Sequence, residues 1–175
     1  GNATTLDRVI RRQFRFVEGD PFDPRAVREA AARIRALGFF GAVDVTQRQG
    51  SAADQVIVRA RVEERPTGSL NFGATYGQAD GVSLTVGLSE SNFLGRGQSL
   101  SFDGTFGGSN ATASVRFVEP ALLERDLRAS ISFGQRSTGS TFTGYDAEIS
   151  DARFGLEFPL GPNGRLESFY RVALT

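Results

Sequence analysis

Residues 65–77 read RPTGSLNFGATYG and divide the chain into two parts with different patterns. A charged segment with helical spacing precedes this stretch, and a long series of alternating segments follows it. Within the stretch itself, apolar residues alternate with polar or small ones. This period of two is typical of a β-strand with two different faces. The apolar positions are Leu70, Phe72, Ala74 and Tyr76, and the others are Ser69, Asn71, Gly73 and Thr75. We predict the first strand of a series here, so one of its backbone edges has no neighbour along the sequence.

The composition excludes several kinds of functional site. The 175 residues include no histidine and no cysteine, so the chain lacks a Cys–His pair, a Ser–His triad and the usual zinc ligands. Nothing in the sequence positions a pair of carboxylates for hydrolysis. The 20 basic and 20 acidic residues give a net charge of zero, so no overall field attracts nucleic acid. We predict a protein that is not an enzyme and needs no metal or cofactor.

The distribution of apolar residues limits the kinds of membrane segment. No run approaches the ~20 apolar residues of a spanning helix, and the opening GNATTLDRV lacks the apolar core of a signal peptide. A membrane barrel is compatible with the sequence, because its strands are only about ten residues long and alternate apolar with polar positions.

The segment before residue 66 has the pattern of a small α+β module. Thr4 and Asp7 resemble a capping box, and apolar residues at helical spacing then predict a first helix over residues 5–14. Two strands are expected over residues 42–49 and 55–65. The complete module would be strand-helix-helix-strand-strand, with the opening Gly-Asn as the tail of a first strand that is otherwise missing.

A second helix has stronger end signals. Asp23 is suited to the N-cap, Pro24 to the first helical position and Gly38 to a left-handed terminator. Several arginines lie on this helix, but Glu29 is spaced to pair with Arg33, so we interpret them as a solvated face rather than a nucleic-acid site.

Residues 66–175 contain seven segments with apolar residues at every second position. A bulge or loop is expected near Ser150 and Asp151, because the apolar residues before and after this point are out of phase. The alternation fits a soluble β-sandwich as well as a membrane barrel. Long strands, up-and-down connections and aromatic residues near strand ends favour the barrel, although the absence of Trp and the number of strands do not fit a closed one.

Three motifs carry a resemblance to a known family. They are LGFFGAVDV at residues 37–45, VEERPTGSLNFGATYG at 62–77 and ESNFLGRGQSL at 90–100. In this order and at this spacing they resemble the BamA family of bacterial outer-membrane protein assembly factors, over essentially the whole chain. The resemblance implies an α+β POTRA-like domain at residues 1–65 without its first strand. It also implies antiparallel transmembrane β-barrel strands at residues 66–175, as a partial barrel of about seven strands.

The resemblance further implies a function and a location. The chain is expected to be a non-enzymatic insertase subunit that folds β-barrel proteins into the bacterial outer membrane, with its N-terminal domain in the periplasm. It would template substrate strands on the edge of its first barrel strand by β-augmentation. The expected partners are nascent outer-membrane β-barrel proteins, lipoproteins of the assembly machine and outer-membrane lipid. The sequence is also compatible with a homo-oligomer, in which several copies of the chain together close one barrel.

Two groups of site residues follow from this interpretation. Arg65 and Pro66 are expected to form a hinge between the domains, and Gly68, Gly73 and Gly77 are expected to soften the first strand. Substrate-strand pairing is assigned to Ser69, Leu70, Asn71, Phe72, Gly73, Ala74, Thr75 and Tyr76. The alternatives are a two-partner-secretion or TamA-like translocation pore, and a passive porin-like barrel.

Overall fold

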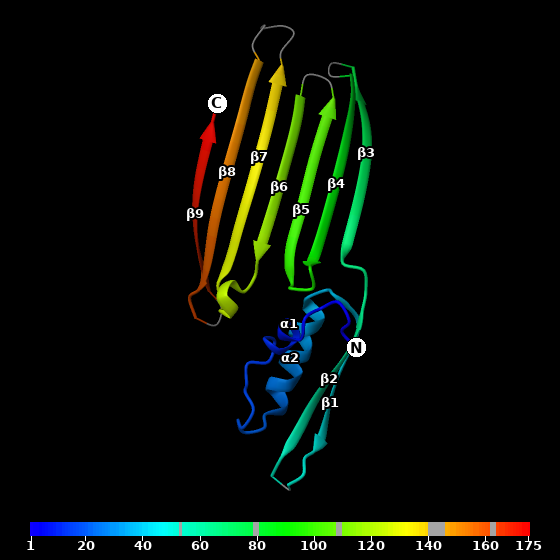
Figure 1. Cartoon of the computed structure of the whole chain (residues 1–175), viewed down its shortest axis with the longest axis vertical. Helices are drawn as coiled ribbons and strands as arrows, with labels where there is room; N and C mark the ends of the chain where they lie inside the picture. Colours follow the sequence, from blue (N-terminus) through cyan, green and yellow to red (C-terminus); the bar gives the residue numbers. More distant parts are fainter. Residues whose placement is uncertain (53, 79–80, 108–109, 140–145, 162–163) are drawn as a thin grey trace. The chain divides into compact units, whose positions relative to one another are not determined.

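The computed structural model describes residues 1–52, 54–78, 81–107, 110–139, 146–161 and 164–175. The chain divides into two compact units. The first comprises Gly1–Thr67 together with Leu94–Gly97, and the second comprises Gly68–Phe93 and Gln98–Thr175. Both described α-helices belong to the first unit, whereas the second is built from strands and one short 3₁₀ turn (Figure 1). Neither helix is long and apolar enough to cross a membrane.

The first unit packs two helices with a two-stranded antiparallel hairpin. Its elements are α1 (Asp7–Arg11), α2 (Pro24–Ala36), β1 (Phe40–Gln49) and β2 (Val56–Glu64). Apolar residues from all four elements and from the α2–β1 connection form the core. The buried members are Val9, Ile10, Ile34, Phe39, Phe40 and Val62. This small core is what holds the helices on the hairpin, because burial of apolar surface is the main favourable term in folding.

Both predicted ends of α2 are confirmed. The Asp23 carboxylate accepts a hydrogen bond of 2.7 Å from the backbone N–H of Arg25, and Pro24 is the first helical residue. Gly38 follows the helix with a φ of 76°, in the left-handed region that favours glycine. The local sequence therefore fixes where this helix begins and ends.

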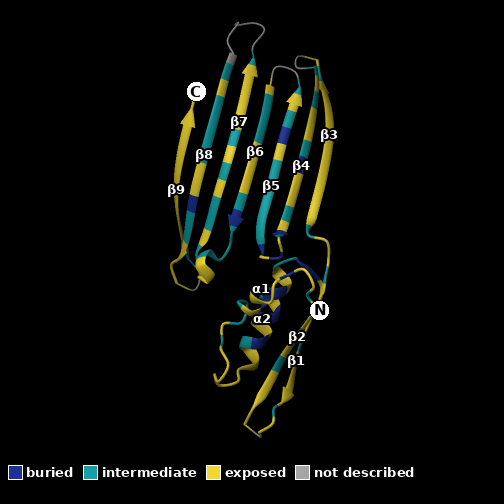
Figure 2. Ribbon diagram, viewed as in Figure 1, coloured by how far each residue is buried: buried dark blue, intermediate teal, exposed yellow. Residues whose placement is uncertain are grey.

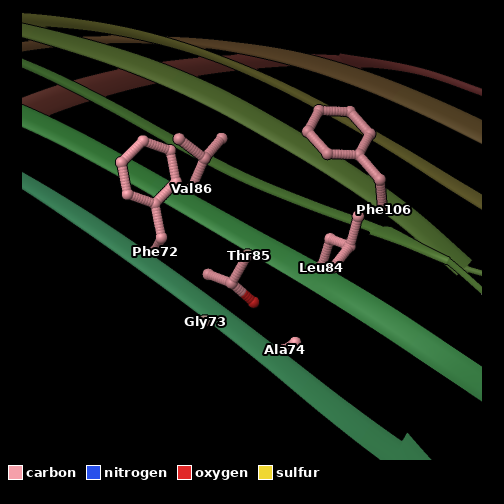
Figure 3. Close-up of a pocket in the computed structure, with 7 residues that line it drawn as sticks. All are labelled: Phe72, Gly73, Ala74, Leu84, Thr85, Val86 and Phe106. Carbon is pink, nitrogen blue, oxygen red and sulfur yellow. The ribbon is translucent and has the colours of Figure 1, made fainter.

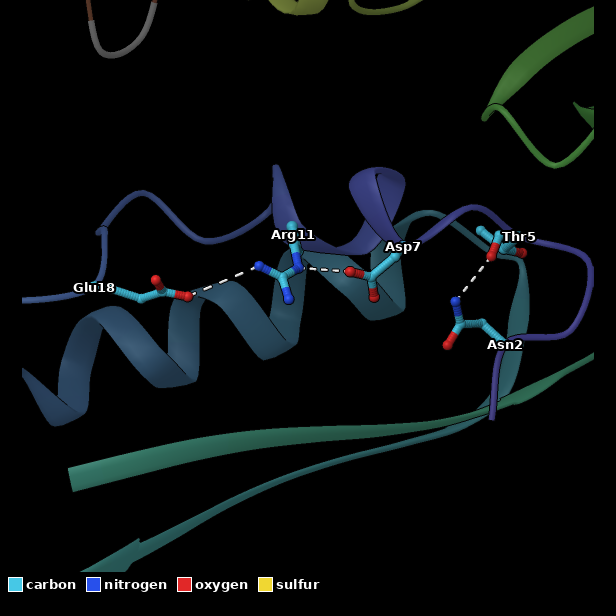
Figure 4. Close-up of polar contacts among 5 residues, drawn as sticks. All are labelled: Asn2, Thr5, Asp7, Arg11 and Glu18. Carbon is cyan, nitrogen blue, oxygen red and sulfur yellow. Dashed lines mark hydrogen bonds and ion pairs between the residues drawn. The ribbon is translucent and has the colours of Figure 1, made fainter. Parts of the chain in front are cut away.

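The first helix differs from its prediction. It covers only Asp7–Arg11 instead of residues 5–14, its N-cap is Leu6, and no side chain caps it. The predicted capping box is therefore wrong. Asp7 pairs with Arg11 instead, with 2.5 Å between Oδ2 and Nε (Figure 4). The backbone N–H of Thr4 bonds a carboxylate on β2, far along the sequence, so a tertiary partner replaces the local one.

The second unit is one antiparallel sheet of seven strands, each paired with its neighbours along the chain, as predicted (Figure 1). The strands are β3 (Gly68–Gly77), β4 (Gly81–Phe93), β5 (Gln98–Gly107), β6 (Asn110–Glu119), β7 (Arg128–Gly139), β8 (Asp146–Pro159) and β9 (Arg165–Leu174). The short turn η1 (Leu122–Glu124) lies between β6 and β7. The order β3-β4-β5-β6-β7-β8-β9 is that of consecutive hairpins.

The prediction of a bulge or loop near Ser150 and Asp151 is wrong. The ladder between β7 and β8 runs without a register shift from Gly139↔Asp146 to Arg128↔Glu157. Ile149 instead lies opposite Arg136, on the face that carries the polar residues. The apolar residues change phase in the sequence because apolar side chains lie on the other face of β8 before Ser150. The backbone of the strand remains regular.

One face of the sheet is apolar and open. One row across it, read from the strand registers, contains Leu70, Leu88, Phe102, Val115, Phe133, Ala152 and Val172. Phe72 is 77% exposed and Phe133 is 55% exposed, and much of the sheet is exposed in Figure 2. The described strands of this unit form one sheet, so no second sheet of the unit closes this face as it would in a sandwich.

Candidate functional site

Strand β3 forms one edge of the described sheet. All ten of its residues lie opposite residues 81–90 of β4 without a register shift. Within the described part of the chain, no strand pairs with its other side. In an antiparallel ladder, every second residue directs both its N–H and its C=O away from the paired neighbour. About half of the residues of β3 therefore present both backbone groups at an open edge.

The eight residues assigned to strand pairing all lie on this strand. They keep the predicted alternation, because Phe72 is opposite Val86 and Ala74 is opposite Leu84, both on the apolar face. All eight are exposed. They are Ser69, Leu70, Asn71, Phe72, Gly73, Ala74, Thr75 and Tyr76. The structure thus brings them together as one continuous edge.

The polar face beside this edge carries small hydroxyl groups. The Oγ atoms of Ser69 and Ser89 are 2.8 Å apart, and the Oγ1 atoms of Thr85 and Thr105 are 3.4 Å apart. Strand β3 itself contains no acidic or basic residue. Recognition at this edge would therefore depend on backbone hydrogen bonds and side-chain shape, with little contribution from charge.

The apolar face beside the edge is hollowed. A shallow depression of about 490 Å³ is lined by Phe72, Gly73, Ala74, Leu84, Thr85, Val86 and Phe106. Figure 3 shows the rings of Phe72 and Phe106 standing up from their strands, with Val86 and Leu84 on the strand between them and the small Ala74 on the strand of Phe72. The depression begins at the open edge, because Phe72 and Ala74 belong to β3.

The predicted hinge residues lie in the connection between β2 and β3. The N–H of Arg65 donates to the carbonyl of Phe39 at 3.0 Å, and its Nε donates to the carbonyl of Gly38 at 2.7 Å. Arg65 is therefore held within the first unit. Pro66 and Thr67 connect Arg65 to the start of β3 at Gly68.

The role of Glu64, the last residue of β2, was not predicted from the sequence. Its carboxylate accepts hydrogen bonds from the backbone N–H groups of Ala3, Thr4 and Thr5, at 2.6 to 3.2 Å. Partial desolvation acts to raise the pKa of Glu64, but these hydrogen bonds, those from Thr4 and Thr5 first, outweigh it and lower the pKa to about 2. The donors lie 59 to 61 residues away, so no local pattern could have indicated this contact.

The polar face farther from the edge contains ion pairs between strands. Arg171 on β9 lies 3.3 Å from Asp151 on β8, and Arg128 on β7 lies 3.7 Å from Glu157 on β8. Among the residues that the structure describes, no group of three or more carboxylates could hold a metal ion. These charges thus pair across the sheet, as is common for opposite charges on neighbouring strands.

Comparisons with known proteins agree with this architecture. Residues 1–65 match the POTRA family model, described as a surface antigen variable number repeat, and residues 92–174 match the Omp85 superfamily domain. The outer membrane protein assembly factor BamA of Buchnera aphidicola is 35% identical over 59% of this chain, which is 17% of that protein. BamA of Neisseria meningitidis serogroup B is 31% identical over 69% of this chain and 15% of that protein. The chain thus spans less than a fifth of the length of these relatives.

Solved structures show the same fold. The crystal structure of BamA from Haemophilus ducreyi lacking POTRA domains 1–3 matches 99% of this chain and 34% of that chain, with a TM-score of 0.81 and 28% identity. CdiB from Acinetobacter baumannii matches 99% of this chain and 35% of that chain, with a TM-score of 0.60 and 14% identity, which shows the fold alone. The predicted fold class, a POTRA-like domain followed by antiparallel barrel strands, is confirmed. Residues 1–65 thus match the POTRA family and residues 92–174 the Omp85 superfamily domain, and the chain as a whole is similar to part of BamA.

Proposed function

We propose that this chain takes part in the assembly of outer-membrane proteins as a non-enzymatic insertase, by pairing substrate strands with the open edge of β3. The observation that carries the proposal is that all ten residues of β3 pair with β4 and that no other strand of the described residues pairs with β3. The relatives named above are outer membrane protein assembly factors, which supports the same role.

The driving force for strand pairing is the satisfaction of backbone groups. In hydrocarbon, each unpaired N–H or C=O costs several kcal/mol. A strand added to β3 would satisfy the outward groups on both chains at once, without covalent chemistry or a nucleotide. Strand addition of this kind derives affinity from main-chain hydrogen bonds and specificity from side-chain positions. The absence of charge on β3 fits a partner that is itself a membrane strand.

The exposed apolar face supports a location in the outer membrane. Large exposed apolar surfaces on a protein mark contact with lipid or with a partner. Leu70, Phe72 and Tyr76 lie on this face and are more than half exposed. Outer-membrane lipid would cover the face, and the POTRA-like unit would lie in the periplasm. Nascent β-barrel proteins and the lipoproteins of the assembly machine are the proposed partners.

The connection between the units is proposed as the hinge. Since Arg65 is bonded to the first unit, rotation would occur after it, at Pro66, where ψ can change although the ring fixes φ. Arg65 would then anchor the hinge instead of moving with the sheet.

Cysteine cross-linking tests the proposal directly. The 175 residues contain no cysteine, so a single cysteine introduced from residue 69 to residue 76 is unique within this stretch. A substrate stalled during assembly carries one cysteine in its terminal strand, and disulfide formation is read by gel mobility. Ser114→Cys is the matched control, because Ser114 lies on the same row as Asn71 but on the central strand β6, which is paired on both sides.

The expected result is a disulfide yield that rises and falls with the register of the two strands along β3, and none at Ser114. A substrate that cross-links equally to Ser114 and to β3 would show passage through a pore instead of strand pairing. No cross-link at any position of β3 would contradict the proposal and favour a porin-like barrel.

A further inference from the structure

The apolar residues of the seven-stranded sheet form a band with an upper and a lower limit. We call the end of the sheet where Gly77 of β3 meets Gly81 of β4 the upper end (Figure 1). In the row from Leu70 to Val172 given above, which we call the central row, every strand carries an apolar residue. Above and below the central row, some strands are apolar and others are polar. The positions of this change define the two limits.

The upper limit falls between β6 and β7. In the first row above the central row, Ala113 of β6 lies opposite Gln135 of β7, and in the second row Ala111 lies opposite Ser137. From β3 to β6 these two rows carry apolar residues or glycine, which are Phe72, Val86, Gly104, Ala113, Ala74, Leu84, Phe106 and Ala111. On β7 and β8 they carry polar residues, which are Gln135, Ser150, Ser137 and Glu148. The apolar surface therefore ends two rows lower on β7 and β8 than on β5 and β6.

The lower limit shifts in the same direction. Glu90 of β4 lies one row below the central row, and Glu119 of β6 lies two rows below it. Ala129 and Leu156, on β7 and β8, lie in the row of Glu119 but are apolar. Phe158 of β8 is apolar one row further down. The apolar surface therefore also begins lower on β7 and β8.

Strand β9 does not follow these limits. Leu174 is apolar opposite Ser150, and Ser168 is polar opposite Leu156. Because β9 is the last strand of the described sheet, the two limits are defined on β3 to β8.

Both limits cross the strand ladder at an angle. The apolar positions cover residues 82–88 of β4, 111–117 of β6 and 152–158 of β8, which is seven residues on each strand. Relative to the central row, this segment lies three rows lower on β8 than on β4. Three rows are six residues, or about 20 Å along a strand, and four strand steps are about 19 Å. The band therefore crosses the ladder at about 45°, close to the strand tilt of about 35–45° in membrane barrels.

A flat layer of lipid is the occupant that fits this outline. Strands that cross a slab at a tilt meet its two surfaces at successively shifted residues, while the apolar segment keeps one length. A protein partner instead buries a patch that is surrounded by a polar rim. Between β3 and β8, no polar rim interrupts the band from side to side in the part of the sheet that the structure describes.

The two faces of β8 exchange character above the upper limit. Glu148 is exposed on the side of the band and accepts a hydrogen bond from Gln135. Ile149 lies on the other side of the strand, opposite Arg136, and is half-buried, as is Ala147 on the same side. A strand with one face in water turns its polar side outward. This part of β8 therefore has the pattern of a strand outside hydrocarbon.

We propose that lipid acyl chains cover the slanted band and that the acyl layer ends between Phe133 and Gln135 on β7 and between Ala152 and Ser150 on β8. The upper part of the β7–β8 hairpin then projects from the hydrocarbon into the headgroup layer and water. Strands β3 to β6 stay covered in the rows where the hairpin is already clear of lipid. This inference rests on the membrane location proposed above and specifies which part of each strand contacts acyl chains.

The experiment compares residues of one row that lie on opposite sides of a limit. A nitroxide is attached to a single cysteine in the full-length protein, after replacement of any other cysteine, and the protein is reconstituted in phosphatidylcholine vesicles. Ala113→Cys and Gln135→Cys form the upper pair, because these residues lie directly opposite each other. Leu156→Cys and Glu119→Cys form the lower pair, because both residues lie opposite Ala129, on its two sides.

Electron paramagnetic resonance measures collisions with oxygen, which concentrates in hydrocarbon, and with a neutral nickel chelate, which stays in water. The ratio of oxygen to nickel collisions is expected to be several-fold higher at Ala113 than at Gln135, and several-fold higher at Leu156 than at Glu119. Val86→Cys is the matched control. It lies in the row of Ala113 on a strand two positions away and should give the same ratio as Ala113.

The outcomes separate this inference from the proposed function. Equal ratios within each pair would overturn the slanted limits and leave the assembly function intact, because cross-linking at β3 measures that function separately. Frequent nickel collisions at all four positions would show water over the band, and would overturn the lipid cover together with the proposed membrane location. Few collisions with either reagent at Ala113 and Leu156 would show that a protein covers the band, and would overturn the inference as well.

Discussion

The carboxylate of Glu64 accepts a hydrogen bond of 2.6 Å from the backbone N–H of Thr5, 59 residues earlier in the chain. Together with the bonds from Ala3 and Thr4, this contact fastens the segment before α1 to the end of β2. Arg65, the next residue, is bonded to the carbonyls of Gly38 and Phe39. The last turn of chain before the sheet is therefore fixed within the first unit by polar contacts from two consecutive residues.

Glu64→Gln is expected to loosen the N-terminal segment. Hydrogen bonds to a charged acceptor contribute about 1.5–3 kcal/mol when shielded, and partial exposure reduces this, so we expect a loss of about 1–2 kcal/mol. Hydrogen exchange at the amides of residues 3–5, followed by mass spectrometry, measures the effect. Glu63→Gln is the control, because Glu63 is the exposed neighbour on the same strand. Equal protection in both variants would contradict the role of Glu64.

The same contact predicts a pH dependence. The pKa of Glu64 is lowered from 4.5 to about 2, so its ionised form is favoured in the folded state. A lowered carboxylate pKa contributes stability above the unfolded value, and the contribution is lost as pH falls toward the folded value. Protection of the amides of residues 3–5 should therefore decrease between about pH 4.5 and 2. The Glu64→Gln protein should show no such step in this range.

Asp23→Ala is expected to destabilise the first unit by about 1 kcal/mol, because it removes the side chain that caps α2. A urea titration followed by circular dichroism at a helix wavelength measures this. Arg28→Ala is the matched control on the exposed side of the same helix and should change stability by less than about 0.5 kcal/mol. A similar loss in both variants would mean that the cap is not the cause.

Gly73→Ala separates two roles of glycine in β3. A methyl group at Gly73 would have its nearest contact with Thr85 at 3.8 Å, which is an ordinary van der Waals distance. We expect the variant to fold and to be about 0.4–1 kcal/mol more stable, because alanine restricts the unfolded chain. If edge pairing uses the flexibility of Gly73, the cross-link yield with a stalled substrate should fall. An unchanged yield would limit Gly73 to a packing role.

Gly104→Ala is expected to behave in the opposite way. Its methyl group would lie 2.7 Å from the Phe106 ring, so the ring must move from its position over β5. Overpacking of this kind costs about 1–3 kcal/mol. Thermal unfolding in detergent is the measurement, and a stability equal to that of the parent protein would show that Phe106 rearranges freely.

Patterns within one element were predictable from the sequence. Asp23 and Pro24 set the start of α2 through groups within two residues of each other. The period of two set the strands, and short connections favoured pairing of consecutive strands, which is the observed order. The position of β3 at one end of that order follows from the same rule. All eight assigned edge residues could therefore be placed on one strand in advance.

Features that depend on distant partners were not predictable. The cap predicted at Thr4 fails because its N–H bonds Glu64. The bulge predicted near Ser150 fails because the ladder with β7 holds β8 regular, even where the face changes character. The depression on the apolar face likewise requires the register of Ala74 with Leu84 and the position of Phe106, which belong to two other strands.

The sequence alone determined the two kinds of segment, their order and the faces of most strands, because these depend on residue spacing and short-range capping. Tertiary structure decided how far α1 extends, that β8 stays regular near Ser150, and which carboxylate fastens the N-terminal segment. Those outcomes depend on pairing between residues far apart in the chain, and a local sequence pattern cannot predict the free energy of such pairing.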